Sequence, residues 1–278
     1  MFLSDNLIFV ELHKTGGTHI LNLLEQITKG QRIGKHNRVP EEYHDRFIIG
    51  SIRNPWDWYV SLWAYGCSSR GSVQHQLTRG VDLRYNYRLL PGEMEKKYLT
   101  PGEWFHQVRN DLTKPVDQWR SLYRDSNDAE AFRQWLTLLL SPERKLDMAE
   151  GYGFFPLAGD HGLLTYRYLK LFTRLGDRIY DHGTLAHDVD LDAIWQHYAI
   201  TRFIIRNEAL EEDLIHALEY AGIRLTDCDR QMILAGRSNK SNTSERGNTS
   251  KYYDDDTRRL VAERERFIIA RHGYQPVD

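Results

Sequence analysis

The stretch that decides the fold spans residues 7–24 and has the sequence LIFVELHKTGGTHILNLL. Its apolar run 7–10 predicts a buried strand, and residues 13–18 form a polar turn that contains two glycines. Apolar residues then recur with helical spacing from Ile20 to Ile27. This order directs backbone N–H groups and the positive end of a helix dipole toward the turn, so the sequence predicts an anion-binding loop.

The residue types of this turn suit an oxyanion. Gly16 and Gly17 let the backbone approach a ligand closely. Lys14 supplies a mobile positive charge, and Thr15 and Thr18 supply hydroxyl donors. A Walker loop has its lysine after the second glycine, whereas Lys14 precedes both, so ordinary ATP hydrolysis is not favoured. A tight turn capped by Thr18, without any ligand, is the alternative.

A second segment has similar chemistry. The run 47–52, FIIGSI, predicts another buried strand, and RNPWDWYVS follows at 53–61. Asn54 suits a helix N-cap and Pro55 suits the first helical position. Arg53 at the strand end and Ser61 almost two turns into the helix can jointly hold one phosphate. The alternative is a capped helix with a surface arginine and a surface serine.

Together the two segments resemble the sulfotransferase family that uses 3′-phosphoadenosine 5′-phosphosulfate (PAPS). HKTGGTH at 13–19 resembles the family's 5′-phosphosulfate loop, and 53–61 matches its R-N-P-x-D-x-x-x-S segment, which binds the 3′-phosphate. The resemblance implies an α/β fold: a three-layer parallel sheet flanked by helices, like that of P-loop NTPases. It further implies one sulfotransferase domain over 1–278, with a helical acceptor-binding insertion at 67–165.

The resemblance also implies the site residues. PAPS would be a co-substrate, with no metal required. Lys14 and His36 would be catalytic, with His36, in Gly34-Lys35-His36-Asn37, taking the proton of the acceptor. Assistance to His36 from His13, Glu41 or Glu42 stays open. The residues expected to bind the cofactor are Lys14, Thr15, Gly16, Gly17, Thr18, His19, Arg53 and Ser61, together with Asn242, Ser244 and Lys251 from a basic loop at 235–251.

Towards the C-terminus, residues 202–206 predict a strand, and Asn207 is expected to cap the helix that follows. Residues 208–213 fit the E-x-L-x-x-D segment that the family often has there, and we assign these acids mainly to helix capping. A final helix is expected from the segment 252–257 to about Arg271.

The acceptor cannot be specified from the sequence. A saccharide hydroxyl is the first choice because the motifs are most similar to those of carbohydrate-modifying relatives, while a phenol, a lipid or a peptide tyrosine stays open, as does the oligomeric state. Phe132 and Trp135 have helical spacing within 129–140 and are expected in the core. A nucleotide or small-molecule kinase and a non-catalytic glycan- or nucleotide-binding relative are the competing functions.

Composition limits the remaining classes. The chain has 278 residues, with 37 Lys and Arg against 39 Asp and Glu, a balance that argues against a nucleic-acid-binding protein. Cys67 and Cys228 have no metal-ligand spacing. No run of 18 apolar residues exists, so no membrane span is expected. Residues 1–6 lack the features of a signal peptide, and Golgi relatives carry a membrane anchor, so a soluble, cytoplasmic, bacterial enzyme is expected.

Overall fold

The computed structural model describes residues 1–81, 100–148, 151–236 and 247–277. The chain divides into two compact units. The first comprises Met1–Asn54, Arg167–Gly176 and Asp190–Thr243, and the second comprises Pro55–Tyr166, Asp177–Val189 and Ser244–Asp278. The expected insertion at 67–165 lies within the second unit, and its role in acceptor binding stays a prediction.

A mixed sheet forms the centre of the first unit. Its strands are β1 (Phe2–Ser4), β2 (Ile8–Val10), β3 (Gly30–Arg32), β4 (Ile48–Ile52) and β5 (Thr201–Arg206), in the spatial order β3-β1-β2-β4-β5. β2, β4 and β5 are parallel neighbours, as expected. β1 pairs antiparallel with both β2 and β3, so the sheet departs from the expected parallel arrangement at this edge.

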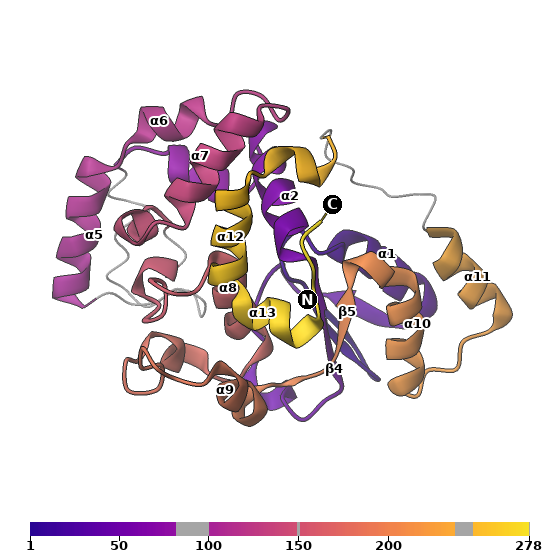
Figure 1. The fold of residues 1–278 in the computed structure, drawn as a ribbon. Coiled ribbons are helices and arrows are strands. Elements are labelled where there is room, and N and C mark those ends of the chain that lie inside the picture. Colours follow the sequence, from indigo (N-terminus) through magenta and orange to yellow (C-terminus); the bar gives the residue numbers. More distant parts are fainter. Residues whose placement is uncertain (82–99, 149–150, 237–246, 278) are drawn as a thin grey trace. The chain divides into compact units, whose positions relative to one another are not determined.

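Helices cover both faces of this sheet. Phe9 and Ile49 lie side by side in the register of β2 and β4. Both belong to a buried cluster that includes residues of α1 (Gly17–Ile27) and α10 (Leu210–Tyr220), two of the helices labelled in Figure 1. Since side chains alternate along a strand, Gly50 faces the opposite side. There a Cβ on Gly50 would lie 2.7 Å from the ring of Phe172, which ends α8 (Leu163–Phe172).

Two further helices belong to the first unit, α9 (Leu191–Tyr198) and α11 (Asp227–Ala235). The expected helix after β5 begins one turn later than Asn207. A 3-10 turn, η5 (Asn207–Ala209), comes first, and α10 then starts without a side-chain cap. The prediction that Asn207 caps this helix is therefore wrong.

The second unit is helical. It contains α2 (Pro55–Cys67), α3 (Ser72–Thr78), α5 (Pro101–Thr113), α6 (Val116–Ser121), α7 (Ala129–Leu139), α12 (Asp255–Arg264) and α13 (Arg266–His272). Nearly every side of α2 is buried, because Trp58 and Leu62 are buried as well as Trp56 and Trp63. A helix that is apolar around its whole circumference belongs in a core.

Aromatic rings from α2 and α7 form that core. The ring of Phe132 lies 5.4 Å from Trp63 and 5.0 Å from Tyr253, in edge-to-face arrangements. Phe132 and Trp135 are fully buried, which confirms their predicted place in the core.

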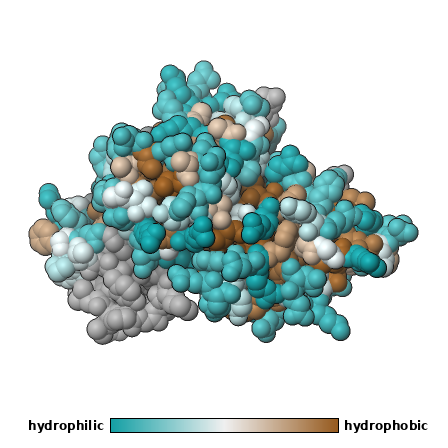
Figure 2. Space-filling view, turned by 90° about the horizontal axis from the view of Figure 1, so that it is seen from below, coloured by the Kyte–Doolittle hydropathy of each residue, from teal (hydrophilic) through white to brown (hydrophobic). Residues whose placement is uncertain are grey.

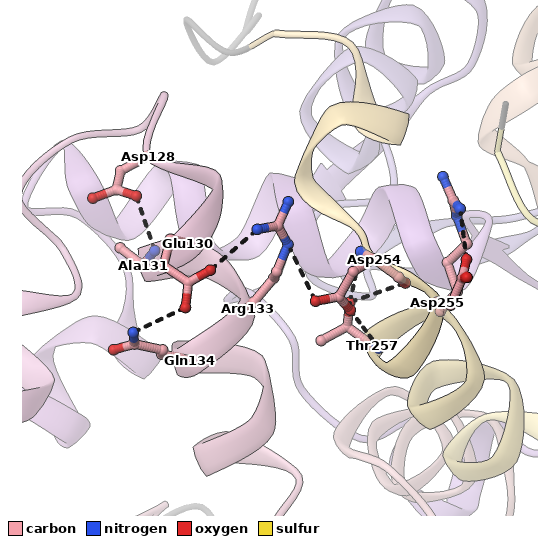
Figure 3. Close-up of polar contacts among 9 residues, drawn as sticks. Asp128, Glu130, Ala131, Arg133, Gln134, Asp254, Asp255 and Thr257 are labelled. Carbon is pink, nitrogen blue, oxygen red and sulfur yellow. Dashed lines mark hydrogen bonds and ion pairs between the residues drawn. The ribbon is translucent and has the colours of Figure 1, made fainter.

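An arginine joins α7 to the start of α12. Nη1 of Arg133 donates to Glu130 at 3.1 Å, and its Nε lies 3.5 Å from the carboxylate of Asp254, as Figure 3 shows. Asp254 caps α12 and exchanges side-chain and backbone hydrogen bonds with Thr257. A capping arrangement of this kind stabilises a helix by roughly 1 kcal/mol.

The last helix is interrupted, contrary to the expected continuous helix as far as Arg271. α12 ends at Arg264 and α13 begins at Arg266 (yellow in Figure 1). Between them Glu265 is fully buried, and its carboxylate accepts hydrogen bonds from the backbone N–H groups of Leu164 at 3.1 Å and Thr165 at 2.9 Å. Glu265 therefore caps the first turn of α8, which explains why the chain turns at this residue.

Hydrophilic residues predominate on the face shown in Figure 2, with apolar residues scattered between them. Among the helices of the described residues, none has the length and apolar character needed to cross a membrane.

Candidate anion-binding site

The loop between β2 and α1 has an unusual backbone conformation. Lys14 has a φ of 63° and Gly16 a φ of 83°, so both lie in the left-handed region. For a lysine this conformation costs about 1–3 kcal/mol, which the surrounding structure must offset. Alternating conformations of this kind make successive N–H groups converge on one point.

Three consecutive N–H groups of this loop are available to a ligand. Those of Gly16, Gly17 and Thr18 have no hydrogen-bond partner within the described part of the chain. α1 has neither a side-chain cap nor an acidic residue in its first turn. The positive end of the α1 dipole therefore coincides with three unsatisfied donors, which is the arrangement that binds oxyanions.

Both glycines of the loop are also required by packing. A Cβ on Gly16 would lie 2.6 Å from Leu210 and 2.7 Å from the side-chain amide of Asn207. A Cβ on Gly17 would lie 2.4 Å from the Cγ of Glu11. The glycines alone are therefore no evidence for a ligand, and the evidence rests on the N–H groups.

Thr15 holds the loop against β4. Its side chain is fully buried, and its hydroxyl donates to the carbonyl of Leu12 at 2.8 Å. The hydroxyl also lies 2.6 Å from the hydroxyl of Ser51. Because the single hydrogen of Thr15 goes to Leu12, Ser51 is the donor in the second bond. The Thr15 hydroxyl is thus committed within the protein.

His19 lies on the first turn of α1, and its ring contacts other parts of the first unit. Its Nε2 is 3.7 Å from a carboxylate oxygen of Glu211, and a Cβ on Gly236 would lie 2.7 Å from the same nitrogen. The structure therefore packs His19 against α10 and the end of α11.

His36 lies beside the loop. Its Nδ1 is 2.9 Å from the carbonyl oxygen of Glu11, the residue that follows β2. Because a carbonyl only accepts hydrogen bonds, Nδ1 carries the hydrogen in neutral His36, and Nε2 carries the lone pair. The φ of His36 is 56°, so His36, like Lys14, is a non-glycine residue in the left-handed region.

His13 stacks on this ring. The centroids of His13 and His36 are 3.4 Å apart, and the ring planes differ by 15°. Burial, the charge of Arg167 and that of Lys170 hold the pKa of His13 well below its usual 6.5, with His36 contributing in the same direction. Arg167 is itself 2 % exposed.

Arg167 and Lys170 were not singled out in the sequence. Both come from α8 and lie three residues apart, so they share one face of this helix. Two cations at helical spacing within a buried helix are the signal that would have identified them.

Arg53 follows β4 and reaches the same loop. Its Nη1 donates to the carbonyl oxygen of Lys14 at 3.3 Å. The next residue, Asn54, donates its backbone N–H to the carboxylate of Glu208 at 2.6 Å. Because β2, β4 and β5 are parallel, their carboxyl ends meet at one edge, where Lys14, Arg53 and Glu208 are brought together.

The remaining predicted residues belong to other segments of the chain. Ser61 is on α2 and is 3 % exposed, and Lys251 is an exposed residue of the turn η7 (Thr249–Tyr252); both belong to the second unit, and their roles stay predictions. Asn242 and Ser244 lie outside the described residues. Glu41 and Glu42 are exposed in the turn η1 (Glu41–Tyr43).

Among the described residues, no cluster of three or more His, Cys, Asp or Glu side chains is placed to hold a metal ion. No protein-family model, curated protein or solved structure matches this chain.

Proposed function

We propose that this protein is a sulfotransferase that moves the sulfuryl group of PAPS to an acceptor hydroxyl, with a saccharide as the preferred acceptor class. The observation that carries the proposal is the row of unsatisfied N–H groups at Gly16, Gly17 and Thr18, with Lys14 and Arg53 beside it. Such a row suits the oxygens of the 5′-phosphosulfate. The fold that we propose is the P-loop-like sulfotransferase fold, with β2, the loop and α1 as its anion-binding unit.

In the proposed reaction the acceptor oxygen attacks sulfur in line. A bond forms between that oxygen and sulfur, and the bond between sulfur and the bridging phosphate oxygen breaks. The acceptor proton passes to Nε2 of His36, and adenosine 3′,5′-bisphosphate leaves. Lys14 and the loop N–H groups stabilise the negative charge that grows on the bridging and sulfuryl oxygens.

His36 suits the role of base because its tautomer is set by the protein. The Glu11 carbonyl, at 2.9 Å from Nδ1, keeps the hydrogen on that nitrogen. The lone pair of the neutral ring is then on Nε2, as a general base requires. The neutral ring of His13, stacked on it, does not oppose the positive charge that His36 acquires.

Arg53 is proposed to contact the 3′-phosphate of the cofactor. A guanidinium suits a phosphate because it donates two parallel hydrogen bonds. Ser61 is proposed as the second contact, on the strength of the sequence motif alone. The 3′-phosphate would then distinguish PAPS from ATP, which lacks it.

A kinase is the competing function. The position of Lys14 before both glycines argues against a Walker loop, because a Walker lysine follows the second glycine. A non-catalytic protein that holds a nucleotide or a glycan is the other alternative. An assay for the transfer of labelled sulfate to pooled saccharides distinguishes it from an enzyme.

Ligand-dependent thermal stability tests the proposal directly. Adenosine 3′,5′-bisphosphate should raise Tm, since a ligand that binds only the folded state stabilises it. Adenosine 5′-monophosphate, which lacks the 3′-phosphate, should raise Tm much less, and ATP with Mg²⁺ should have little effect. A larger shift with ATP and Mg²⁺ than with the bisphosphate would favour the kinase instead.

A further inference from the structure

Asp57 is the one acid of the R-N-P-x-D-x-x-x-S segment, and the fold gives it a partner far along the chain. It lies in the first turn of α2. Its Oδ1 accepts a hydrogen bond at 2.5 Å from the hydroxyl of Thr249, the first residue of η7. Thr249 is 6 % exposed, so water has limited access to this bond. Both residues belong to the second unit, so the contact lies within one compact part of the chain.

The same turn is attached to α2 at its other end as well. The ring of Tyr252 lies 5.8 Å from that of Trp63 in an edge-to-face arrangement. The hydroxyl of Tyr253 donates to the carbonyl oxygen of Trp56 at 2.8 Å. Lys251 lies between the two attachments and is exposed. The backbone of Lys251 is therefore fixed from both sides, while its side chain extends to the surface.

Asp57 is poorly suited to contact the cofactor itself. It lies four residues before Ser61, so both residues project from the same side of α2. A carboxylate that touched a phosphate on this side of the helix would repel it. The bond to Thr249 instead gives this acid a positioning role.

This side of α2 needs a cation if it is to hold a phosphate. Ser61 is 3 % exposed, and a hydroxyl carries no charge to balance that of a phosphate group. Lys251 follows Thr249 by two residues, so the bond to Asp57 keeps its segment against the helix that carries the phosphate motif. A lysine whose backbone is fixed loses less freedom on binding than one on an unattached chain.

We propose that Asp57 is a positioning residue for the cofactor and that, through Thr249, it holds Lys251 at the side of α2 that binds the 3′-phosphate. The inference rests on the proposed function, because it takes this side of α2 to bind the cofactor. Asp57 itself makes no contact with the nucleotide. Its contribution to binding passes through Thr249 and Lys251.

A merely structural role for Asp57 has different consequences. A carboxylate in the first turn of a helix stabilises that helix through its dipole, with or without Thr249. Replacement of Thr249 leaves this stabilisation in place and removes only the link to Lys251. Thr249 is therefore the residue to change.

Calorimetric titration of the intact protein with adenosine 3′,5′-bisphosphate and with adenosine 5′-monophosphate tests this inference. Thr249→Val keeps the shape of the side chain but removes the hydroxyl. It should weaken bisphosphate binding by about tenfold or more, the low end for one hydrogen bond to a charged group. Binding of the monophosphate, which has no 3′-phosphate, should hardly change. Thr249→Ser retains the hydroxyl and should restore the wild-type ratio of the two affinities.

Lys251→Ala shows whether the effect passes through the lysine. Changes to two residues that act through one contact are not additive, so Thr249→Val should weaken bisphosphate binding no further in the Lys251→Ala protein. Thr184→Val is the matched control, because Thr184 donates to the carboxylate of Asp181 at 2.6 Å outside the motif. This control should bind both nucleotides as the wild type does.

Either of two results would overturn the inference: an unchanged ratio of the two affinities in Thr249→Val, or a full additional loss when Thr249→Val is combined with Lys251→Ala. Thr249→Ala serves as a second variant should Thr249→Val fold poorly, and it should lower the ratio in the same way. The wild type separates the two proposals. If it binds the bisphosphate no more tightly than the monophosphate, the proposed function fails and this inference fails with it. If the wild type prefers the bisphosphate and Thr249→Val retains that preference, only the role of Asp57 fails.

Discussion

The rings of His13 and His36 stack face to face with their centroids 3.4 Å apart, so two imidazoles share one surface of the candidate site. Burial and the nearby Arg167 lower the pKa of His13, and this ring is therefore neutral at pH 7. A neutral ring supports its neighbour by packing without adding a charge. The stack thus gives His36 a fixed orientation while leaving it able to accept a proton.

Replacement of His36 should separate chemistry from binding. His36→Phe keeps a ring to stack on His13 but has no nitrogen, so sulfate transfer should fall by about 10²- to 10⁴-fold, the usual contribution of a general base. The affinity for adenosine 3′,5′-bisphosphate, measured by calorimetry, should change little. His216→Phe, at an exposed position of α10, is the matched control. Loss of nucleotide binding in His36→Phe would instead indicate a structural role.

Lys14→Ala should lower turnover by about 10²-fold or more, because it removes a cation from the position where transition-state charge develops. Steady-state assays with labelled PAPS measure the effect. Lys29→Ala, an exposed lysine beyond the end of α1, controls for the loss of one positive charge. Unchanged turnover in Lys14→Ala would remove this residue from catalysis.

Arg53→Ala should weaken the binding of adenosine 3′,5′-bisphosphate by about 1.5–3 kcal/mol, the typical value of a charged hydrogen bond. Binding of adenosine 5′-monophosphate should hardly change, since it lacks the group that Arg53 is proposed to hold. Arg70→Ala is a control at an exposed position. If Arg53→Ala weakened both nucleotides equally, the assignment to the 3′-phosphate would be wrong.

Glu265 should make the fold less stable as pH rises. Burial raises the pKa of its carboxyl from 4.5 to about 6. The folded state therefore binds this proton more tightly than the unfolded chain does. Protonated Glu265 contributes about 2 kcal/mol to the free energy of unfolding below pH 4.5, and this contribution is lost as pH rises through 6. Urea unfolding between pH 4.5 and 7.5 measures the slope, which Glu265→Gln should remove.

His161 should act in the opposite direction. Burial, followed by the charge of Arg266, lowers the pKa of His161 from 6.5 to about 4, and Arg266 donates a hydrogen bond to its Nε2 at 3.1 Å. The stability linked to neutral His161, up to about 3 kcal/mol, is present above pH 6.5 and lost as pH falls toward 4. The two groups oppose each other between pH 4.5 and 6. His161→Gln should therefore reveal the slope of Glu265 alone, and a variant with the wild-type profile would contradict this.

Strands and helices with strong periodicity were predictable from the sequence. β2, β4 and β5 lie within about one residue of the expected runs, and α1 and α7 follow the expected apolar spacing. β2, β4, α1 and α7 each bury a set of side chains that recurs with the period of the element, so the local sequence pattern reports the environment of these four elements. The approach of His36 and Arg53 to the loop was also expected, although from the family resemblance rather than from periodicity.

Features that depend on distant partners were not predictable. All three residues of β3 are exposed, so nothing in its sequence indicated an antiparallel edge strand. The turn at Glu265 arises because α8, about 100 residues earlier, needs a cap for its first N–H groups. The packing of Glu11 against Gly17 was not predictable either, because a glutamate after a strand is ordinary until the helix that follows is seen to begin beside it.

The bond between Thr15 and Ser51 has a consequence for the energetics of recognition. Ser51 lies in β4 and anchors the loop there, and Arg53 follows only two residues later, directly after the end of this strand. This short segment of chain thus sets the distance between the N–H groups of the loop and the guanidinium of Arg53. A nucleotide that spans both would find the spacing already made during folding, and little conformational entropy would be lost on association.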